Sequence, residues 1–392
     1  MPSAISLACH PIEKVRIALI GLGDRGFKTL ERYSYIVNAE IRYIVDLHAE
    51  RLDKANALLK SQGRPVAKTL QGQNAWAEAC QRDDVDLIYV CTEWQSHTPI
   101  ALYAMQCGKH VAVEVPAATT IEDCWKLVKT AELTQRHLFM TENCCYDIFA
   151  LETLEMHHQH LFGQITHCEG AYIHHLNAAT DTDDCGKKDT HHNWMLQACA
   201  HHGGNPYPTH AIGPIAQLLD FHHTDRMLTL TSITSKGVDN AEYGSCDGKI
   251  NTSLIKTKLG TTILLQLDVT TPRPYSRMQT ICGTKAYAQK YPIPIVQSHT
   301  SDAILGDDAI AYLQQFAVSP AAQLWIEGKD KKVKNPMNYA MDSRLIDCLH
   351  KGHPLDIDVY DAAEWSCLAE LSQQSANAGG TPVEIPDFRG TH

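Results

Sequence analysis

Apolar and polar positions alternate in two different ways along the chain of 392 residues. In the first part, short apolar runs such as Leu87–Cys91 and His110–Glu114 flank longer stretches of helical periodicity such as His97–Cys107. This alternation is typical of β-α-β units, in which right-handed crossovers join parallel strands. Residues 1–146 are therefore predicted to form a doubly wound α/β Rossmann domain. Its strands are expected at Val15–Ile20, Ile41–Val45, Leu87–Cys91, His110–Glu114 and His137–Met140, with further helices at Arg51–Gln62 and Ile121–Thr134.

After Tyr146 the apolar runs are longer, richer in threonine and separated by short turns, of which Leu259-Gly260 is one. Short turns favour antiparallel pairing. Residues 147–392 are therefore predicted to form an α+β domain with an open, mostly antiparallel sheet, whose C-terminal segment packs back on the Rossmann domain. Strands are expected at Ile165–His175, Leu228–Lys236, Ser253–Lys258, Thr261–Val269 and Arg277–Gly283, and helices at Ile212–Leu219, Tyr339–His350 and Val359–Ala376.

Composition and charge narrow the class of protein. Hydrophobic residues make up 44% and charged residues 20%, as in ordinary globular domains. The net charge is −11, and no basic cluster exists beyond Lys329–Lys334, which argues against nucleic acid as a partner. Close-set histidines such as His157-His158 and His191-His192 do not have the spacing of zinc ligands, so no metal is expected.

No apolar run approaches the roughly 20 residues that span a bilayer, so no membrane association is predicted. The first residues lack the pattern of a secretory signal, which predicts a cytoplasmic location, with export left open. An open sheet face can pair with a second subunit, so a homo-oligomer stays an option.

A glycine-rich motif directly follows the first predicted strand and opens a helix: Gly21-Leu22-Gly23-Asp24-Arg25-Gly26. In this context a G-x-G-x-x-G motif is typical of dinucleotide binding. Gly21 permits the tight turn, Gly23 lets backbone amides approach the pyrophosphate, and Gly26 lets helix and strand come close. At the end of the second strand, Asp46 can accept the ribose hydroxyls and repel a 2′-phosphate, which favours NAD over NADP. The motif, with Asp24 and Arg25 inside it, therefore predicts an NAD site.

With these residues in place, the chain resembles the Gfo/Idh/MocA superfamily, in which a Rossmann domain precedes an open α+β sheet. In the dehydrogenases of that superfamily the fifth strand ends in Glu-Lys-Pro, and the lysine assists the hydride chemistry. Here the strand ends in Glu114-Val115-Pro116. Because valine cannot transfer a proton, an ordinary dehydrogenase of that type is disfavoured.

Longer strings narrow the resemblance: Glu114-Val115-Pro116-Ala117-Ala118, Glu142-Asn143-Cys144-Cys145-Tyr146, His167-Cys168-Glu169-Gly170-Ala171-Tyr172-Ile173-His174, Tyr207-Pro208-Thr209-His210 and Pro272-Arg273-Pro274-Tyr275-Ser276-Arg277. They are similar to strings of the NAD-dependent glycosidases of glycoside hydrolase family 109, and the match extends from Lys14 to Phe388. The resemblance implies α-N-acetylgalactosaminidase activity on the ends of glycans. It also implies NAD⁺ that is tightly bound and recycled.

In the mechanism that this family implies, hydride leaves C3 of the sugar and the resulting ketone acidifies the C2 hydrogen. A base removes that proton and the aglycone leaves from C1; water then adds and the ketone is reduced again. Such a site needs groups that move protons near C2 and O3 rather than the paired carboxylates of ordinary glycosidases. The resemblance points to Tyr172, Tyr207 and His210 as the proton-moving groups, and to Glu142 and Tyr291 as sugar ligands. Which of the three acts at C2 and which at O3 is left open.

These residues also have purely structural interpretations. Tyr172 could be a cross-strand aromatic residue, His210 a capping or core histidine, and Glu142 a surface carboxylate. Since a free tyrosine has a pKa of about 10, a tyrosine that acts as a base needs help from a neighbour such as His210 or from the nicotinamide ring.

Further cofactor contacts implied by the resemblance follow three successive strands, at the edge where open α/β sheets bind ligands. They are Thr92, Trp94 and His97 after the fourth strand, Glu114 after the fifth and Asn143 after the sixth. Trp94 could instead be part of the core.

The match departs from the family's pattern at two places in the second domain. Family members carry Trp-Arg, whose arginine can reach the sugar, where this chain has Trp194-Met195, and methionine lacks the charge and the donors. The approach to Tyr207 is Gly204-Asn205-Pro206 instead of Gly-Asn-Leu. Trp194 and Met195 are still expected at the sugar site, but the departures leave the sugar preference more open than the cofactor. The alternatives are the same mechanism on another hexosaminide or anomer, a sugar oxidoreductase with net NAD(H) turnover, and a non-catalytic NAD sensor.

Overall fold

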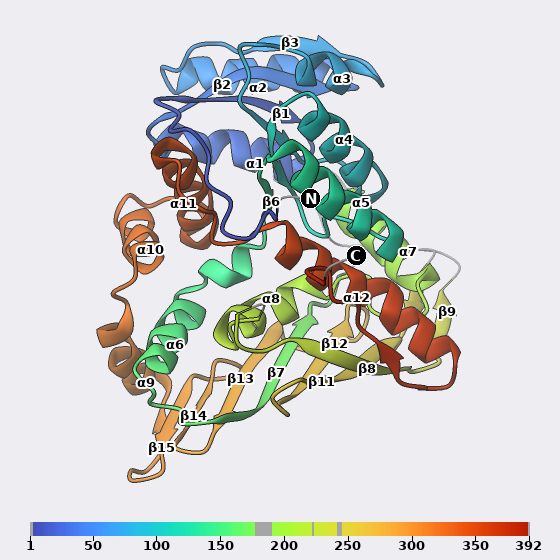
Figure 1. The fold of residues 1–392 in the computed structure, drawn as a ribbon, viewed down its shortest axis with the longest axis vertical. Coiled ribbons are helices and arrows are strands. Elements are labelled where there is room, and N and C mark those ends of the chain that lie inside the picture. The colour runs from blue at the N-terminus through green and yellow to red at the C-terminus, as the bar shows by residue number, and fades with distance from the viewer. Residues whose placement is uncertain (1–2, 177–189, 222, 241–244, 391–392) are drawn as a thin grey trace. The chain divides into compact units, whose positions relative to one another are not determined.

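The computed structural model describes residues 3–176, 190–221, 223–240 and 245–390 (Figure 1). The chain forms two compact units, of which the first contains Met1–Glu142 and Leu324–Ser366, and the second contains Asn143–Gln323 and Cys367–His392. The first unit thus takes in a helical segment from late in the chain. The division falls at Glu142, where the sequence suggested Tyr146.

A parallel sheet of six strands forms the centre of the first unit, as predicted. Its order is β3-β2-β1-β4-β5-β6, and all paired neighbours run parallel. The order reverses between β1 and β4, and the crevice at the carboxyl ends of such a pair is where open α/β sheets bind ligands. The strands are β1 (Val15–Ile20), β2 (Ala39–Asp46), β3 (Lys68–Gln71), β4 (Leu87–Val90), β5 (His110–Val113) and β6 (Leu138–Met140).

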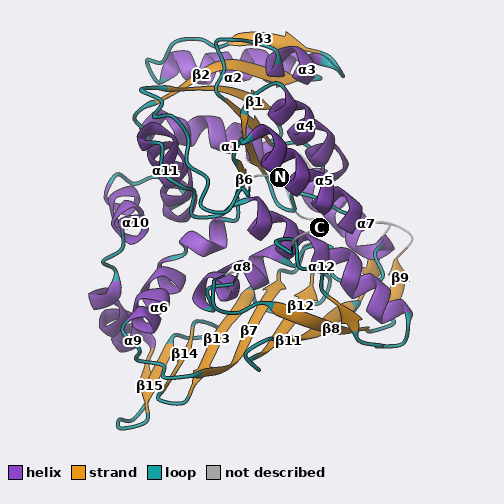
Figure 2. Ribbon diagram, viewed as in Figure 1, coloured by secondary structure: helices purple, strands orange, loops and turns teal. Residues whose placement is uncertain are grey.

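The five strands predicted in this unit are confirmed, with small differences at their ends. The sequence missed β3, because Lys68–Gln71 lies at the edge of the sheet with three of its four residues exposed and so lacks an apolar pattern. Helices pack around the strands (Figure 2). They are α1 (Asp24–Arg32), α2 (Ala49–Ser61), α3 (Ala75–Cys80), α4 (Trp94–Gln106), α5 (Ile121–Thr134) and α11 (Pro336–Lys351), with a 3-10 turn at Tyr33–Tyr35.

Local capping explains where two of these helices begin and where one of them ends. The Thr120 side chain accepts a hydrogen bond from the amide of Asp123 at the start of α5. Asn335 caps α11 in the same way, Pro336 occupies its first turn, and Gly352 ends it in the left-handed conformation.

The second unit is built on a mixed sheet of nine strands in the order β16-β15-β14-β13-β7-β12-β11-β8-β17. All paired neighbours are antiparallel except β7 and β12, which run parallel, so the predicted open and mostly antiparallel sheet is confirmed. The strands are β7 (Ile165–Ile173), β8 (Met227–Thr234), β11 (Ile250–Thr257), β12 (Thr262–Asp268), β13 (Ser276–Gly283), β14 (Ala286–Gln289), β15 (Ile295–Ser298), β16 (Ile304–Leu305) and β17 (Val383–Glu384), with a separate pair β9 (Val238–Asn240) and β10 (Ser245–Asp247).

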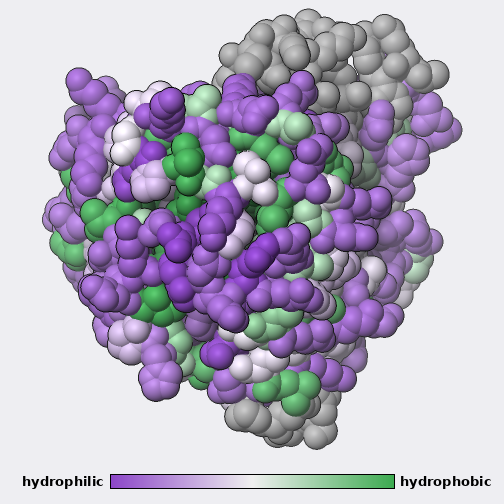
Figure 3. Space-filling model, turned by 90° about the horizontal axis from the view of Figure 1, so that it is seen from above, coloured by the Kyte–Doolittle hydropathy of each residue, from purple (hydrophilic) through white to green (hydrophobic). Residues whose placement is uncertain are grey.

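Helices of the second unit pack on one side of this sheet, and the closest is α8 on β7 (Figure 2). None of the helices in the described ranges is long and apolar enough to cross a membrane. The face drawn in Figure 3 is mostly hydrophilic, with scattered apolar side chains. The helices are α6 (Ile148–His158), α7 (Thr190–His201), α8 (Thr209–Leu218) and α9 (Gly306–Leu313), with α10 (Pro320–Asp330) and α12 (Val359–Asn377) at the two late divisions between the units, and 3-10 turns at Asn143–Tyr146 and Gln314–Phe316.

Candidate active site and cofactor site

The three glycines of the motif have different surroundings. Gly21 has a φ of +88°, and a Cβ there would lie 2.6 Å from the carbonyl oxygen of Cys91. A Cβ on Gly26 would overlap with the carbonyl oxygen of Gly21. A Cβ on Gly23, in contrast, would meet nothing within 4 Å. Gly21 and Gly26 are therefore required by packing within the protein, whereas Gly23 leaves open space beside the N-terminus of α1, which fits a bound pyrophosphate.

Asp46 lies at the end of β2 and braces the glycine loop. One carboxylate oxygen accepts the amide of Leu22 at 2.7 Å and the other accepts the amide of His48 at 2.9 Å. Arg51 approaches the same carboxylate, with its Nη1 3.6 Å from Oδ1. The side chain is thus held at the carboxyl edge of the sheet, where the adenosine ribose of a dinucleotide binds.

An ion pair joins the start of α1 to the end of β5. Arg25 Nε donates to Glu114 Oε1 at 2.7 Å, and Arg25 Nη2 lies 3.5 Å from Oδ1 of Asn338 on α11. Asp24 instead faces solvent and pairs with Lys28 at 3.0 Å. Of the two charged side chains inside the motif, Arg25 is therefore the one held at the carboxyl edge of the sheet. Asn338 could not be predicted as a partner of Arg25, because it lies more than 300 residues away along the chain.

The segment after β4 carries the three other residues of the first unit that were expected near the cofactor. His97 is buried, with Nδ1 2.8 Å from the carbonyl oxygen of Pro116 and Nε2 3.0 Å from that of Thr92. Burial lowers the pKa of His97, although both carbonyls oppose the shift. The imidazole therefore joins the end of β4 to the segment after β5. The Thr92 hydroxyl accepts from Ser96 at 2.6 Å, and Trp94 is buried in the first turn of α4.

In the second unit, Tyr172, Tyr207 and His210 form one aromatic cluster. The ring centroids of Tyr172 and Tyr207 are 5.0 Å apart, those of Tyr207 and His210 4.7 Å, and those of Tyr172 and His210 5.6 Å. The Tyr207 hydroxyl lies 3.0 Å from His210 Nε2. Residues from β7, from the loop before α8 and from α8 itself are thus brought together.

Close packing of α8 on β7 explains this convergence. A Cβ on Gly170 of β7 would overlap with the carbonyl oxygen of Ala211 on α8. Only glycine therefore lets the helix approach the strand so closely. Since residues two apart share a face of a strand, Tyr172 lies on the same face as Gly170, and His210 precedes Ala211 on the helix.

Two hydrogen bonds fix the loop that carries Tyr207. The buried amide of Asn205 donates to the Ser372 hydroxyl at 2.7 Å, and the Asn205 side chain accepts the amide of Tyr207 at 3.0 Å. The asparagine of Gly204-Asn205-Pro206 thus orients Tyr207, and the proline after it leaves both bonds intact.

A group of charges surrounds Tyr291. Arg277 Nη2 lies 3.4 Å from the Tyr291 hydroxyl and 2.6 Å from Asp147 Oδ2, and Lys290 Nζ also lies 2.6 Å from that oxygen. Burial by itself would raise the pKa of Asp147, but the two cations hold it well below its usual range. Burial and the charge of Asp147 raise the pKa of nearby Glu152 to about 7. Tyr291 was predicted from the sequence, but the charged residues around it were not. Of these, only Arg277 lay in a string that matched the family.

Met195 lies in the core of the second unit. It is 2% exposed and belongs to an apolar cluster against which Tyr172, Trp194 and Tyr207 pack. The other members of that cluster are Leu176, Leu196, Cys199, Leu267 and Val269. The methionine thus supports the aromatic residues from the apolar side, and Trp194 is only partly buried beside it.

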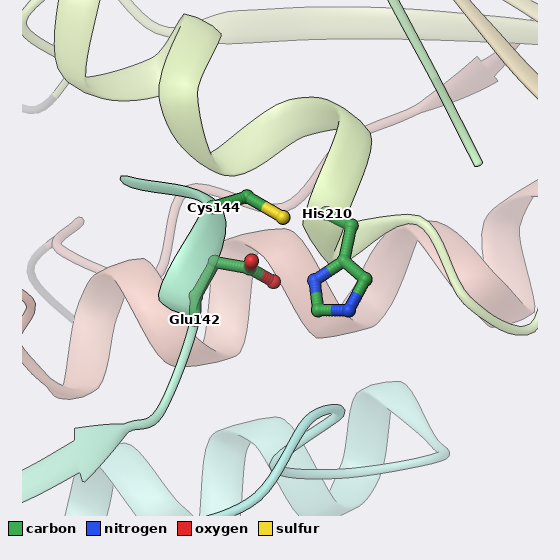
Figure 4. Close-up of side chains that lie close together, drawn as sticks. All are labelled: Glu142, Cys144 and His210. Atoms are coloured by element: carbon green, nitrogen blue, oxygen red, sulfur yellow. The ribbon is translucent and has the colours of Figure 1, made fainter. Parts of the chain in front are cut away.

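Glu142 and Asn143 lie at the point where the chain passes from the first unit to the second. Both are buried. Glu142 lies two residues after the end of β6, and its amide donates to the carbonyl of Met140 at 2.7 Å. Figure 4 draws Glu142 with Cys144 and His210. Within the second unit, the Cys144 sulfur and a ring nitrogen of His210 lie within 4.8 Å of each other. A thiol and an imidazole are both ligand types that zinc accepts, but the chemistry proposed below uses no metal.

Comparison with known proteins places the chain in a family. The family model described as "Glycosyl hydrolase 109, C-terminal domain" matches residues 146–392, and "Oxidoreductase family, NAD-binding Rossmann fold" matches residues 15–142. The chain belongs to glycoside hydrolase family 109. An α-N-acetylgalactosaminidase of Bacteroides fragilis is 46% identical, with 98% of this chain and 94% of that protein covered. A family 109 protein of Phocaeicola vulgatus is also 46% identical, with 99% and 97% covered.

Solved structures share the fold at low identity. Levoglucosan dehydrogenase in complex with NADH and levoglucosan has a TM-score of 0.73 at 14% identity, with 95% of this chain and all of that chain covered. The aldose-aldose oxidoreductase of Caulobacter crescentus has a TM-score of 0.70 at 16% identity over the same shares. These likenesses confirm the Gfo/Idh/MocA fold, and the first unit of this family 109 protein is an NAD-binding Rossmann domain.

Membership of family 109 is consistent with the second residue after β5, which is a valine where the dehydrogenases of the superfamily carry a lysine. Val115 is buried there, and its side chain carries no group that could transfer a proton. Of the residues expected at the sugar site of this glycoside hydrolase, the second unit brings Tyr172, Tyr207 and His210 together and holds Tyr291 among charges. To these it adds His174 and Tyr275, with ring centroids 5.3 Å apart; both lie in the matching strings, but no role was predicted for either.

Proposed function

We propose that this protein hydrolyses terminal α-N-acetylgalactosaminides with NAD as a tightly bound cofactor that is recycled in every turnover. The observation that carries the proposal is the cluster of Tyr172, Tyr207 and His210, which supplies phenols and an imidazole for moving protons. The sugar preference rests on the similarity to the α-N-acetylgalactosaminidase of Bacteroides fragilis.

The residues of the first unit suit NAD. Gly23 leaves room for the pyrophosphate, Asp46 is oriented for the ribose hydroxyls, and Arg25 is held at the cofactor edge by Glu114. We propose that His97 acts by joining the segments of Thr92 and Pro116, which would shape the edge of the sheet that holds NAD. When bound, NAD⁺ accepts a hydride from C3 of the sugar and gives it back at the end of the cycle.

The proton-moving residues lie in the second unit. Oxidation at C3 releases the O3 hydroxyl proton, and the ketone at C3 makes the C2 hydrogen acidic enough for a positioned base. We propose that Tyr207 passes a proton to His210 across their hydrogen bond. Of the two positions on the sugar, O3 and C2, one would then be served by Tyr207 and the other by Tyr172. Departure of the aglycone from C1 requires a proton on its oxygen, and the same groups return protons when water adds.

The remaining residues orient the sugar. We propose that Glu142 and Tyr291 bind its hydroxyl and amide groups, with Arg277 orienting the Tyr291 hydroxyl. Trp194 offers an apolar ring surface to the sugar. Because Met195 is buried, we propose that it acts on the sugar through Tyr172 and Tyr207, which pack on the same cluster.

One assay tests the proposal. The purified protein is incubated with para-nitrophenyl α-N-acetylgalactosaminide without added NAD, and release of nitrophenol is followed. We expect many turnovers for each bound cofactor, without stoichiometric formation of NADH. Release only from another hexosaminide or from the β-anomer of a nitrophenyl panel would change the sugar assignment. No release from the whole panel, with NADH formed from free sugars, would make the protein a sugar oxidoreductase.

A further inference from the structure

A second tyrosine–histidine pair adjoins the first in the second unit. The Tyr172 hydroxyl lies 3.0 Å from His174 Nδ1, which equals the distance between the Tyr207 hydroxyl and His210 Nε2. The rings of the two tyrosines meet at an interplanar angle of 69°. Two phenol–imidazole pairs therefore lie side by side, and their tyrosine rings are in contact.

The backbone and a neighbouring ring hold His174 in place. It follows β7, and its amide donates to the carbonyl of Asp268 on β12 at 2.9 Å. Residues 172 and 174 are two apart in extended chain, so their side chains share a face. The Tyr275 ring packs edge-on against the imidazole, with centroids 5.3 Å apart at 86°. The contact of His174 with Tyr172 is thus fixed by strand pairing and by packing.

We propose that His174 is a positioning residue that takes up and returns the proton of Tyr172, so that the site stores two exchangeable protons at once. This inference rests on the function proposed above. It assigns His210 to Tyr207 and His174 to Tyr172 as separate partners.

The proton balance of the proposed reaction requires two stores. When hydride leaves C3 with its electron pair, the O3 hydroxyl proton goes to the first base. The C2 proton then goes to the second base, the electrons of the C2–H bond form the C1–C2 double bond, and the bond from C1 to the aglycone oxygen breaks. One stored proton goes to that oxygen. Water then adds its hydroxyl to C1 and gives its other proton to the base that protonated the aglycone. The two stored protons then return to C2 and, with the hydride on C3, to O3.

A single imidazole cannot carry out both withdrawals. It has one free acceptor position when neutral, and both nitrogens are donors once it is protonated. If His210 holds the O3 proton, it is unavailable when the C2 proton leaves. Two pairs keep these protons apart inside one cluster.

Variants at position 174 test this role. His174→Gln keeps an acceptor for the Tyr172 hydroxyl but cannot take up its proton, and His174→Phe removes both properties. We expect each to lower kcat by roughly 100-fold, as for loss of a general acid–base group, while KM for the nitrophenyl substrate stays within about three-fold. His175→Gln is the matched control, because His175 is the exposed next residue, and it should keep the wild-type kcat. Thermal melting shows which variants are folded, and His174→Gln is the conservative choice should His174→Phe not fold.

A double-variant cycle separates the two pairs. If His174 acts through Tyr172, adding His174→Gln to Tyr172→Phe should cost no further activity, whereas adding it to Tyr207→Phe should multiply the losses. The inference is overturned if folded His174→Gln keeps the wild-type kcat, or if its loss multiplies with that of Tyr172→Phe. An inactive wild-type protein would instead overturn the proposed function itself, so the two failures are distinguishable.

Discussion

At the scale of single residues, Asp46 offers a direct test of the expected preference for NAD over NADP. Its two carboxylate oxygens accept backbone amides of Leu22 and His48, so the negative charge is fixed at the edge where the adenosine ribose binds. A 2′-phosphate at this position would meet that charge directly. Arg51, with Nη1 3.6 Å from Oδ1, would pair with such a phosphate if the carboxylate were absent.

We therefore expect Asp46→Ser to weaken NAD binding by roughly ten-fold, the loss of one hydrogen bond to a charged group, and to allow NADP to bind. Isothermal titration of both dinucleotides into cofactor-free protein measures the change. Adding Arg51→Ala should remove the NADP binding again. Unchanged NAD affinity in Asp46→Ser would contradict the assignment.

The role of His210 can be separated from cofactor binding. His210→Ala removes the partner of the Tyr207 hydroxyl, so we expect turnover to fall by at least about 100-fold. The NAD content of the purified protein should stay at the wild-type level, as measured in the supernatant after denaturation. His201→Ala, on the exposed side of α7, is the control. An active His210→Ala protein would exclude the histidine from the reaction.

At the scale of elements, the contact between α8 and β7 decides the geometry of the aromatic cluster. Gly170 has no side chain where the carbonyl oxygen of Ala211 approaches, and this brings His210 to the Tyr172 ring. The strand was predicted from its apolar run, but its partners were not. β7 pairs parallel with β12 and antiparallel with β13. These partners could not be predicted, because they are separated from β7 by long stretches of chain and meet it only in the folded protein.

We expect Gly170→Ala to push α8 away from the sheet. Overpacking of this kind costs about 1–3 kcal/mol of stability, and the displaced His210 should lower kcat more than it raises KM. Urea unfolding and steady-state kinetics measure the two effects. Gln297→Ala on the exposed side of β15 should change neither. Wild-type activity in Gly170→Ala would show that the close approach does not matter for the site.

At the scale of the whole molecule, buried histidines should make the protein sensitive to acid. His110 and His137 lie at the starts of β5 and β6, with ring centroids 5.0 Å apart. Burial and the neighbouring His137 lower the pKa of His110 to about 3, and burial and Arg136 lower that of His137 to about 4. In the unfolded chain a histidine has a pKa of about 6.5. Below that pH the unfolded chain therefore binds protons that the folded chain does not, and stability falls.

The expected loss is about 1.4 kcal/mol per histidine for each pH unit between about 6.5 and 4. Urea unfolding followed by circular dichroism at pH 7.5, 6.5 and 5.5 measures it. In His137→Gln, the part of the pH dependence of the unfolding free energy that this histidine pair causes should fall by about half. An identical slope in wild type and variant would mean that other groups cause the acid sensitivity.

The amino-acid sequence by itself determined all Rossmann strands except β3, the glycine motif, Asp46 and the family, because these depend on local apolar runs, on turn chemistry and on strings of neighbouring residues. It also named Tyr172, Tyr207 and His210, although their meeting could not be read from a single segment. The tertiary structure alone decided that Met195 is buried beneath the aromatic residues, that Asp147 pairs with both Arg277 and Lys290 beside Tyr291, and that His174 joins Tyr172. The physical reason is that burial and charge pairing depend on which strands and helices pack together, and those neighbours are distant in the chain.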